Sequence, residues 1–301
     1  MTITTAMVEQ SLTMFAFLAI ELTLLFLIIS YLVGVLQLYL SPAKIQSILS
    51  SKQGKGYIIA AFLGAITPFC SCSTIPFLKG LLRAKAGFGT MLVFLFASPL
   101  LNPIIIGLFV VTFGLQVAVF YFLVAMSVSV IAGFLLEKLG FEQYVKAEAY
   151  SQPLAKSCSG NKAQPVNKWL TIWHITWKDF KSVVPYLMAG IAIGSIIYGF
   201  MPTELVASMA GEENPFAIPI AAIIGIPLYI RAEAVIPLSA ALAAKGMGLG
   251  AVMALIIGSA GASLTEVILL KSIFKNPMIL AFLVVIIGMA IMAGYLYQYL
   301  F

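Results

Sequence analysis

Two stretches of similar pattern decide the fold of this chain: ITPFCSCSTIPFL at 66–78 and IPLYIRAEAVIPL at 226–238. Each lies inside a long apolar segment and carries a pair of prolines. Proline removes a backbone hydrogen bond and clashes with the preceding helical turn, so each segment should break near its middle. Each half-segment is about 16 Å long as a helix, roughly half of the ~30 Å hydrocarbon core of a bilayer. Each stretch therefore predicts either a re-entrant helical hairpin or a continuous, kinked span.

The chain around these stretches is too apolar for a soluble protein. Of its 301 residues, 62% are hydrophobic and only 9% are charged, and the mean hydropathy is +1.08. Soluble domains carry about 25% charged residues, so lipid must be the solvent for much of this surface. We therefore predict an all-α integral membrane protein. Six further apolar runs are long enough to span a bilayer: Ser11–Leu40, Phe88–Val110, Val117–Leu136, Ser182–Met201, Met247–Leu270 and Pro277–Leu300.

The positive charges indicate how the chain is oriented. The net charge is +6, and the basic residues lie in loops between apolar runs, which is typical of membrane orientation and not of nucleic-acid binding. With two re-entrant hairpins and both termini periplasmic, 15 basic residues face the cytoplasm and only Lys245 faces outside, while Arg231 lies at the second break. Eight full transmembrane helices, the alternative, leave 11 basic residues inside and 5 outside at best. The charges favour the re-entrant arrangement in a bacterial inner membrane.

The two halves of the sequence resemble each other. A shift of 161 residues aligns glycines and prolines, which fix backbone geometry: Gly64 with Gly225, Pro76 with Pro237, Gly87 with Gly248 and Gly89 with Gly250. Each half then holds three spans and one broken hairpin, and three is odd, so the second half is inverted. We predict a first repeat at 1–140, a cytoplasmic linker with an interfacial helix at 141–178, and a second repeat at 179–301. Two inverted repeats with broken helices are a transporter architecture.

The linker helix carries Trp169, Trp173 and Trp177 at intervals of four residues. This stripe predicts an amphipathic helix at the membrane interface, or a stripe that packs against the transmembrane bundle. We expect no catalytic role for His174, and Cys158 should be an ordinary thiol.

A Cys-Ser-Cys motif at 70–72 occupies the first break. Pro76 suits the first turn of a returning helix, with Ser73 or Thr74 as its cap. The cysteines would then precede a helix N-terminus, which favours anions and lowers the pKa of a thiol. Two thiolates at this spacing suit one soft, thiophilic centre such as a metalloid, although small buried cysteines are also common in cores. The candidate ligands are Cys70, Ser71, Cys72 and Ser73.

The second break carries Arg231 and Glu233, which the 161-residue shift aligns with Cys70 and Cys72. Charges at membrane depth are usually functional, and the alternative is an ion pair that only satisfies itself. Glu233 is the candidate proton carrier, and Arg231 would hold an anionic substrate or keep Glu233 ionised. The spans after each hairpin are also interrupted by proline or glycine. They add a polar ligand candidate, Asn102, and a coupling candidate, Glu266, to which the first span adds Glu21.

The sequence contains no Walker loop, dinucleotide fingerprint or nucleophile elbow. We therefore predict neither ATP hydrolysis nor a cofactor, and a transporter of a small molecule rather than an enzyme. Two alternatives stay open: a membrane thiol enzyme that passes electrons or sulfane sulfur to a soluble redox partner, and a subunit of a larger permease. A homo-oligomer is compatible with each of them.

The run TPFCSCSTIPFLKGLLRAKAGFGTMLVFLFASPLLNP at 67–103 resembles the YraQ-like predicted permeases, as does the stretch at 226–238. This bacterial family includes efflux permeases for trivalent organoarsenicals such as methylarsenite. The resemblance implies an inner-membrane secondary transporter in which Cys70 and Cys72 form a thiol pair at the transport site. It leaves sulfur compounds and other thiophilic solutes open as substrates.

Overall fold

The computed structural model describes residues 54–66, 71–83, 86–147, 168–200, 216–227 and 247–300, with residues 236 and 242 and part of the segment between 12 and 35. Within these residues the regular structure is helical, apart from one bridge between Val145 and Phe274. Four of the described helices are long and apolar enough to cross a membrane, or five if one bent pair counts as a single span. The expectation of an all-helical membrane protein is confirmed at this level.

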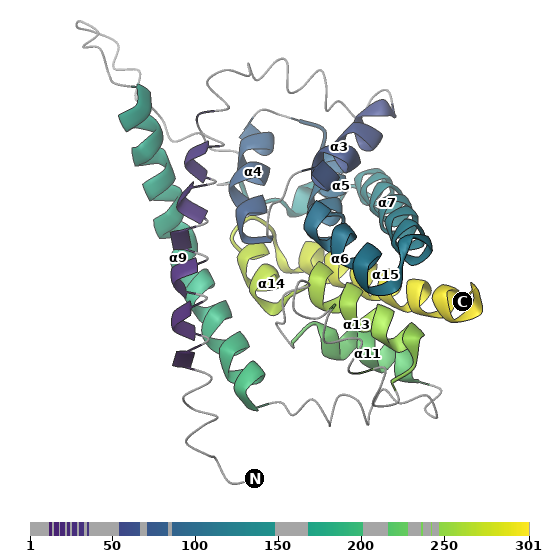
Figure 1. The fold of residues 1–301 in the computed structure, drawn as a ribbon. Coiled ribbons are helices and arrows are strands. Elements are labelled where there is room, and N and C mark those ends of the chain that lie inside the picture. The colour runs from purple at the N-terminus through teal and green to yellow at the C-terminus, as the bar shows by residue number, and fades with distance from the viewer. Residues whose placement is uncertain are drawn as a thin grey trace, which may run out of the picture.

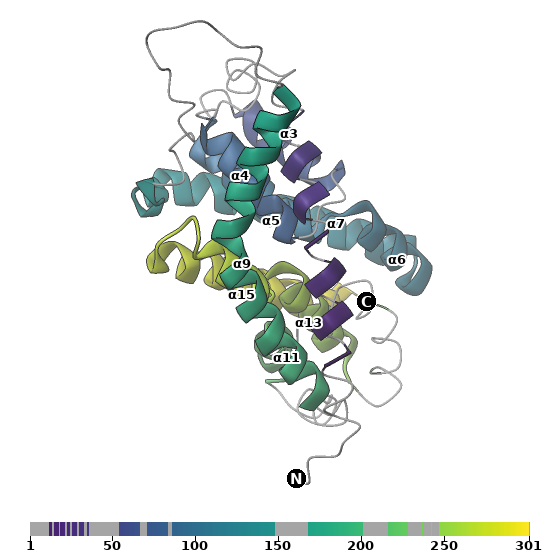
Figure 2. The same cartoon turned by 90° about the vertical axis from the view of Figure 1, so that its left-hand side faces the viewer.

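The helices fall into two groups along the chain. The first group consists of α3 (Lys55–Ile66), α4 (Ser71–Arg83), α5 (Phe88–Leu100), α6 (Pro103–Phe113), α7 (Leu115–Lys138) and the short 3-10 helix η2 (Phe141–Tyr144). The second consists of α9 (Lys168–Phe200), α11 (Ala217–Gly225), α13 (Leu249–Gly261), α14 (Leu264–Leu270) and α15 (Asn276–Leu300). Helices α3–α7 form one part of the molecule and α11–α15 the other (Figures 1 and 2). Helix α9 runs along both, beside a candidate span at Phe15–Leu32 (Figure 1).

Helices in the two groups begin at equivalent positions. Helices α5, α6 and α7 start at residues 88, 103 and 115, and α13, α14 and α15 start at residues 249, 264 and 276, each 161 residues later. Helix packing repeats as well. A methyl group at Gly64 would lie 3.1 Å from the backbone nitrogen of Ser98, and one at Gly225 would lie 2.9 Å from that of Ser259. Helix α3 thus approaches α5 as closely as α11 approaches α13, at residues that the sequence shift aligns.

Helices α5 and α13 form the centre of the bundle. Every residue of α5 is buried, and so is almost every residue of α13. The two helices meet near their C-terminal ends, because a methyl group at Gly261 would lie 3.2 Å from Cδ2 of Leu100. Phe96 of α5 also stacks on Phe282 of α15, with 5.3 Å between the ring centroids. Both helices end at a break in a membrane span, so the two breaks lie in the interior, where the two parts of the molecule meet.

Helices α7 and α15 cover this centre and turn apolar side chains outwards. Leu123 and Ile131 of α7 and Leu280 and Val284 of α15 are all more than half exposed. Such faces are stable in lipid and not in water, which agrees with the composition of the chain.

Helix α9 is a single helix of 33 residues that continues through position 178, the predicted end of the linker. Its tryptophan stripe contacts the N-terminal helix: the rings of Trp173 and Tyr31 lie 6.1 Å apart, edge to face. Phe180 and Phe26 pack 5.8 Å apart farther along the same pair of helices. The interfacial helix and the following span are therefore one continuous rod, and the predicted domain boundaries remain a prediction.

Candidate functional site

The first interrupted span consists of α5 and α6, which meet at an angle of 43°. Asn102 is the N-cap of α6, and its side-chain oxygen accepts a hydrogen bond from the backbone N–H of Ile104 at 3.0 Å. Pro103 occupies the first helical position, where a missing N–H has no cost. The predicted ligand Asn102 is buried at this break, and its oxygen already stabilises the start of α6.

A tyrosine completes the hydrogen bonding of the same break. Because the N–H of Ile104 bonds to Asn102, the carbonyl of Leu100 loses its usual helical donor. The hydroxyl of Tyr121 on α7 donates to that carbonyl at 2.7 Å, and its ring stacks on Phe109 with centroids 4.3 Å apart. The sequence analysis missed Tyr121. The 161-residue shift aligns it with Phe282, and this difference of one hydroxyl between the repeats is the signal that points to it.

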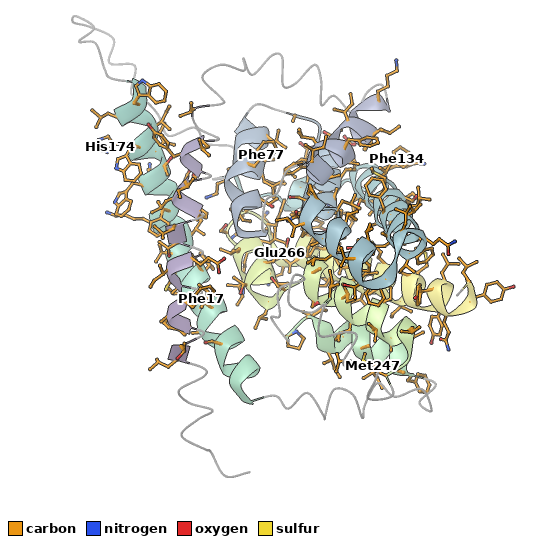
Figure 3. All side chains as sticks on the ribbon, in the orientation of Figure 1. Phe17, Phe77, Phe134, His174, Met247 and Glu266 are labelled. Carbon is orange, nitrogen blue, oxygen red and sulfur yellow. The ribbon has the colours of Figure 1, made fainter. Side chains whose placement is uncertain are left out.

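The second interrupted span consists of α13 and α14. Ser263 is the N-cap of α14, and its hydroxyl accepts a hydrogen bond from the backbone N–H of Glu266 at 3.3 Å. Ser263 and Glu266 have the spacing of a capping box, which explains the start of the helix. The Glu266 side chain is 1% exposed and lies near the centre of the molecule, where the two helix groups meet (Figure 3). The neighbouring Thr265 hydroxyl is buried and has no hydrogen-bond partner among the described residues.

Helix α4 carries part of the thiol motif. It begins at Ser71, so the prediction that Pro76 opens this helix with Ser73 or Thr74 as its cap is wrong. The helix forms earlier because proline excludes only the hydrogen bond to the residue four positions before it. That acceptor is the carbonyl of Cys72, which Pro76 therefore leaves without its helical donor.

The backbones of Ser71, Cys72 and Ser73 lie in the first turn of α4, while Cys70 and both charges of the second break, Arg231 and Glu233, lie outside the described residues. Helix α4 packs against α14 and α5. The first-half helix that holds part of the Cys-Ser-Cys motif is thus in contact with the second-half helix that holds Glu266.

Three more charged or titratable groups were considered in the sequence. Glu21 is partly buried on the N-terminal helix. Lys79, which the charge count assigns to the cytoplasm, is instead buried within α4. His174 is exposed on the outer side of α9 (Figure 3). Within the part of the chain that the structure describes, no three His, Cys, Asp or Glu side chains gather closely enough to hold a metal ion.

Apolar helices of spanning length, two interrupted spans and a buried carboxylate define a multi-pass membrane protein. The chain belongs to the ArsP_1 family of predicted permeases, which matches residues 7–299. This match over nearly the whole chain confirms the resemblance seen in the sequence.

Characterised by name only, the relatives agree with this family. A UPF0718 protein of Methanocaldococcus jannaschii is 23% identical over 296 residues, covering 80% of this chain and 81% of the relative. A protein of Streptococcus mutans described as a putative two-component membrane permease complex subunit is 25% identical over 283 residues, covering 91% of this chain and 90% of the relative. The UPF0718 protein YcgR of Bacillus subtilis is 27% identical over 105 residues, covering 34% of this chain and 36% of the relative. No solved structure matches the chain significantly.

Proposed function

We propose that this chain is a secondary transporter of the inner membrane, built from two inverted repeats that each contain a re-entrant hairpin. One observation carries the proposal: helix starts recur 161 residues apart, and the two interrupted spans they define meet in the interior. Broken helices at the interface of inverted repeats form the substrate sites of known transporter folds, because their free backbone groups face a central cavity. In this proposal the substrate site lies between the two hairpin tips.

The substrate we propose is a small thiophilic or anionic solute. Cys70 and Cys72 would bind a soft centre, assisted by Ser71 and Ser73, and Arg231 would hold an anionic group. A trivalent organoarsenical is the first candidate, because an arsenic(III) centre with one organic substituent takes two thiolates. The first turn of α4, which contains Cys72, supports the proposal because the N-terminus of a helix favours thiolate over thiol.

Transport would be coupled to protons, with Glu233, Glu266 and Glu21 as carriers. Burial of the Glu266 side chain beside a break in a membrane span supports a coupling role, because carboxylates at such depth are rarely structural only. Asn102 lies at the other break. Its oxygen is engaged by Ile104, so its amide NH₂ is the group left to meet a substrate.

Ligand binding to the purified protein tests this proposal. Methylarsenite, arsenite and thiosulfate would each be titrated while thermal unfolding is followed in detergent, since a ligand that prefers the folded state raises the unfolding temperature. We expect one compound to stabilise the wild type and the Cys158→Ser variant equally, and to have no effect on Cys70→Ser/Cys72→Ser. Cys158 is the matched control, because it is the third cysteine of the chain and lies in the predicted linker. Equal stabilisation of the double variant would exclude the thiol site.

A second candidate function is a membrane subunit of a two-component permease. The Streptococcus mutans relative, described as such a subunit, favours it. A stoichiometric partner that co-purifies with the tagged chain, together with no transport by the chain alone in liposomes, would support this candidate over a self-sufficient transporter.

A further inference from the structure

The start of the linker is joined to the turn between α14 and α15. Val145 and Phe274 form an antiparallel bridge. The backbone N–H of Lys146 donates to the carbonyl of Ile273 at 2.9 Å, and that of Lys275 donates to the carbonyl of Tyr144 at 2.8 Å. We call residues 144–146 and 271–275 the basic clamp. Its backbone hydrogen bonds fix two segments that are more than 120 residues apart in the sequence.

The basic clamp gathers three lysines. The ammonium group of Lys146 donates to the carbonyl of Lys271 at 2.5 Å, which holds this charge against the other segment. The side chains of Lys271 and Lys275 are exposed. Two carboxylates lie nearby: Glu142 on η2 is exposed, and Glu137 accepts a hydrogen bond from Tyr57. Three ammonium groups on one small surface repel each other, so the clamp favours binding of an anion.

Apolar surface adjoins the clamp on both sides. Leu139, at the end of α7, is 67% exposed, and Leu280, in the second turn of α15, is 64% exposed. Helices α7 and α15 are in contact and carry the outward-facing apolar side chains described above. A molecule with an anionic head and long acyl chains matches this combination, because its head would meet the lysines and its chains would lie along α7 and α15.

The equivalent turn in the first half shows that the lysines are not needed to form the turn. Residues 110–114, between α6 and α7, align with residues 271–275. Val110 and Gly114 stand there in place of Lys271 and Lys275, and Phe113 stands in place of Phe274. The same helix–turn–helix forms with no basic residue, so the charges on one turn serve something other than the fold.

We propose that the basic clamp binds the phosphate of an anionic phospholipid, such as phosphatidylglycerol or cardiolipin, at the end of α7 and α15. Basic residues at the membrane surface attract anionic headgroups, each strengthening binding by about a factor of five. The proposal depends only on the membrane location of the chain and not on the transported substrate.

Native mass spectrometry of the purified protein, titrated with phosphatidylglycerol or with phosphatidylcholine of the same acyl chains, tests the proposal. We expect the wild type to prefer phosphatidylglycerol, and Lys271→Gln/Lys275→Gln to bind it about 25-fold more weakly, the product of two factors of about five. Lys178→Gln/Lys181→Gln is the charge-matched control, because these lysines are exposed on α9, and it should keep wild-type binding. The single variant Lys275→Gln, expected to bind about fivefold more weakly, serves if the double variant does not fold.

Three results would overturn the proposal. The first is equal binding of phosphatidylglycerol and phosphatidylcholine by the wild type, and the second is unchanged binding by Lys271→Gln/Lys275→Gln. The third is an equal loss in Lys178→Gln/Lys181→Gln, which would mean that total charge and not the clamp governs binding. Thermal unfolding in phosphatidylcholine alone verifies that the variants are folded.

Discussion

Helix α5 crosses α7 in the first half of the molecule much as α13 crosses α15 in the second. A methyl group at Gly89 would lie 2.9 Å from the carbonyl oxygen of Gly133, and one at Gly250 would lie 2.7 Å from that of Gly294. In both crossings, glycine faces glycine across two helix backbones. The 161-residue shift aligns Gly89 with Gly250 and Gly133 with Gly294.

Side chains around the two crossings differ in kind. In the first half, the hydroxyl of Tyr57 donates to the carboxylate of Glu137 beside Gly89. In the second half, Ile218 and Gln298 occupy the same positions beside Gly250. The backbone crossing is thus common to both halves, whereas a polar bond across it is present in one half only. Small residues set the geometry of each half, and the side chains around them are free to diverge.

The largest effect is expected at the glycine crossings themselves. Gly133→Ala and Gly294→Ala should each lower the free energy of unfolding by about 2 kcal/mol, because the added methyl meets a backbone carbonyl 2.7 Å away that cannot move aside. Thermal unfolding in detergent measures the loss. Gly288→Ala is the control: it lies in α15 with open space around it, so the better helix propensity of alanine should raise stability by up to about 1 kcal/mol. A loss confined to one half would break the equivalence of the two crossings.

A smaller effect, restricted to the first half, is expected from the polar pair. Tyr57→Phe should cost about 1.5 kcal/mol, because a hydrogen bond to a carboxylate is lost. Gln298→Ala, at the exposed position equivalent to Glu137, should change stability by less than about 0.5 kcal/mol. The same unfolding measurement compares them. Equal losses would show that the two crossings are chemically alike after all.

The smallest effects are expected at the helix caps of the two breaks. Asn102→Ala and Ser263→Ala should each cost about 1 kcal/mol, because each removes the side-chain acceptor that caps α6 or α14. Ser127→Ala, on the exposed face of α7, is the control and should be neutral. An unchanged unfolding temperature for one cap variant alone would mean that the two breaks are held by different interactions.

The sequence predicts the helices well, because hydropathy and proline act locally. The expected spans at 88–110, 117–136, 247–270 and 277–300 correspond to α5 with α6, α7, α13 with α14, and α15. The shift of 161 residues was also visible, since glycine and proline report backbone geometry directly. The start of α4 was placed too late, because a proline was taken to mark the first turn when it lies in the second.

The contacts that hold the breaks were not predictable in the same way. Tyr121 reaches Leu100 from 21 residues away, and Tyr57 reaches Glu137 from 80 residues away. Neither pairing follows from local periodicity, and a carboxylate at the end of a span looks like an ordinary interfacial charge. Asn102 was recognised as a polar group near the centre, but its capping role depends on where α6 begins. The candidate thiol and charge residues at 70, 231 and 233 lie outside the described residues and remain predictions.

The length of α9 determines how deep the protein sits in its bilayer. A helix of 33 residues is about 50 Å long, whereas a hydrocarbon core is about 30 Å thick. Some 13 residues must therefore protrude, and the tryptophans at 169, 173 and 177 fall within the first 10 residues, followed by lysines at 178 and 181. Aromatic rings and lysines prefer the headgroup region. Helix α9 would thus act as a depth gauge, and a bilayer with longer acyl chains should draw its tryptophans towards the hydrocarbon and shift their fluorescence to the blue.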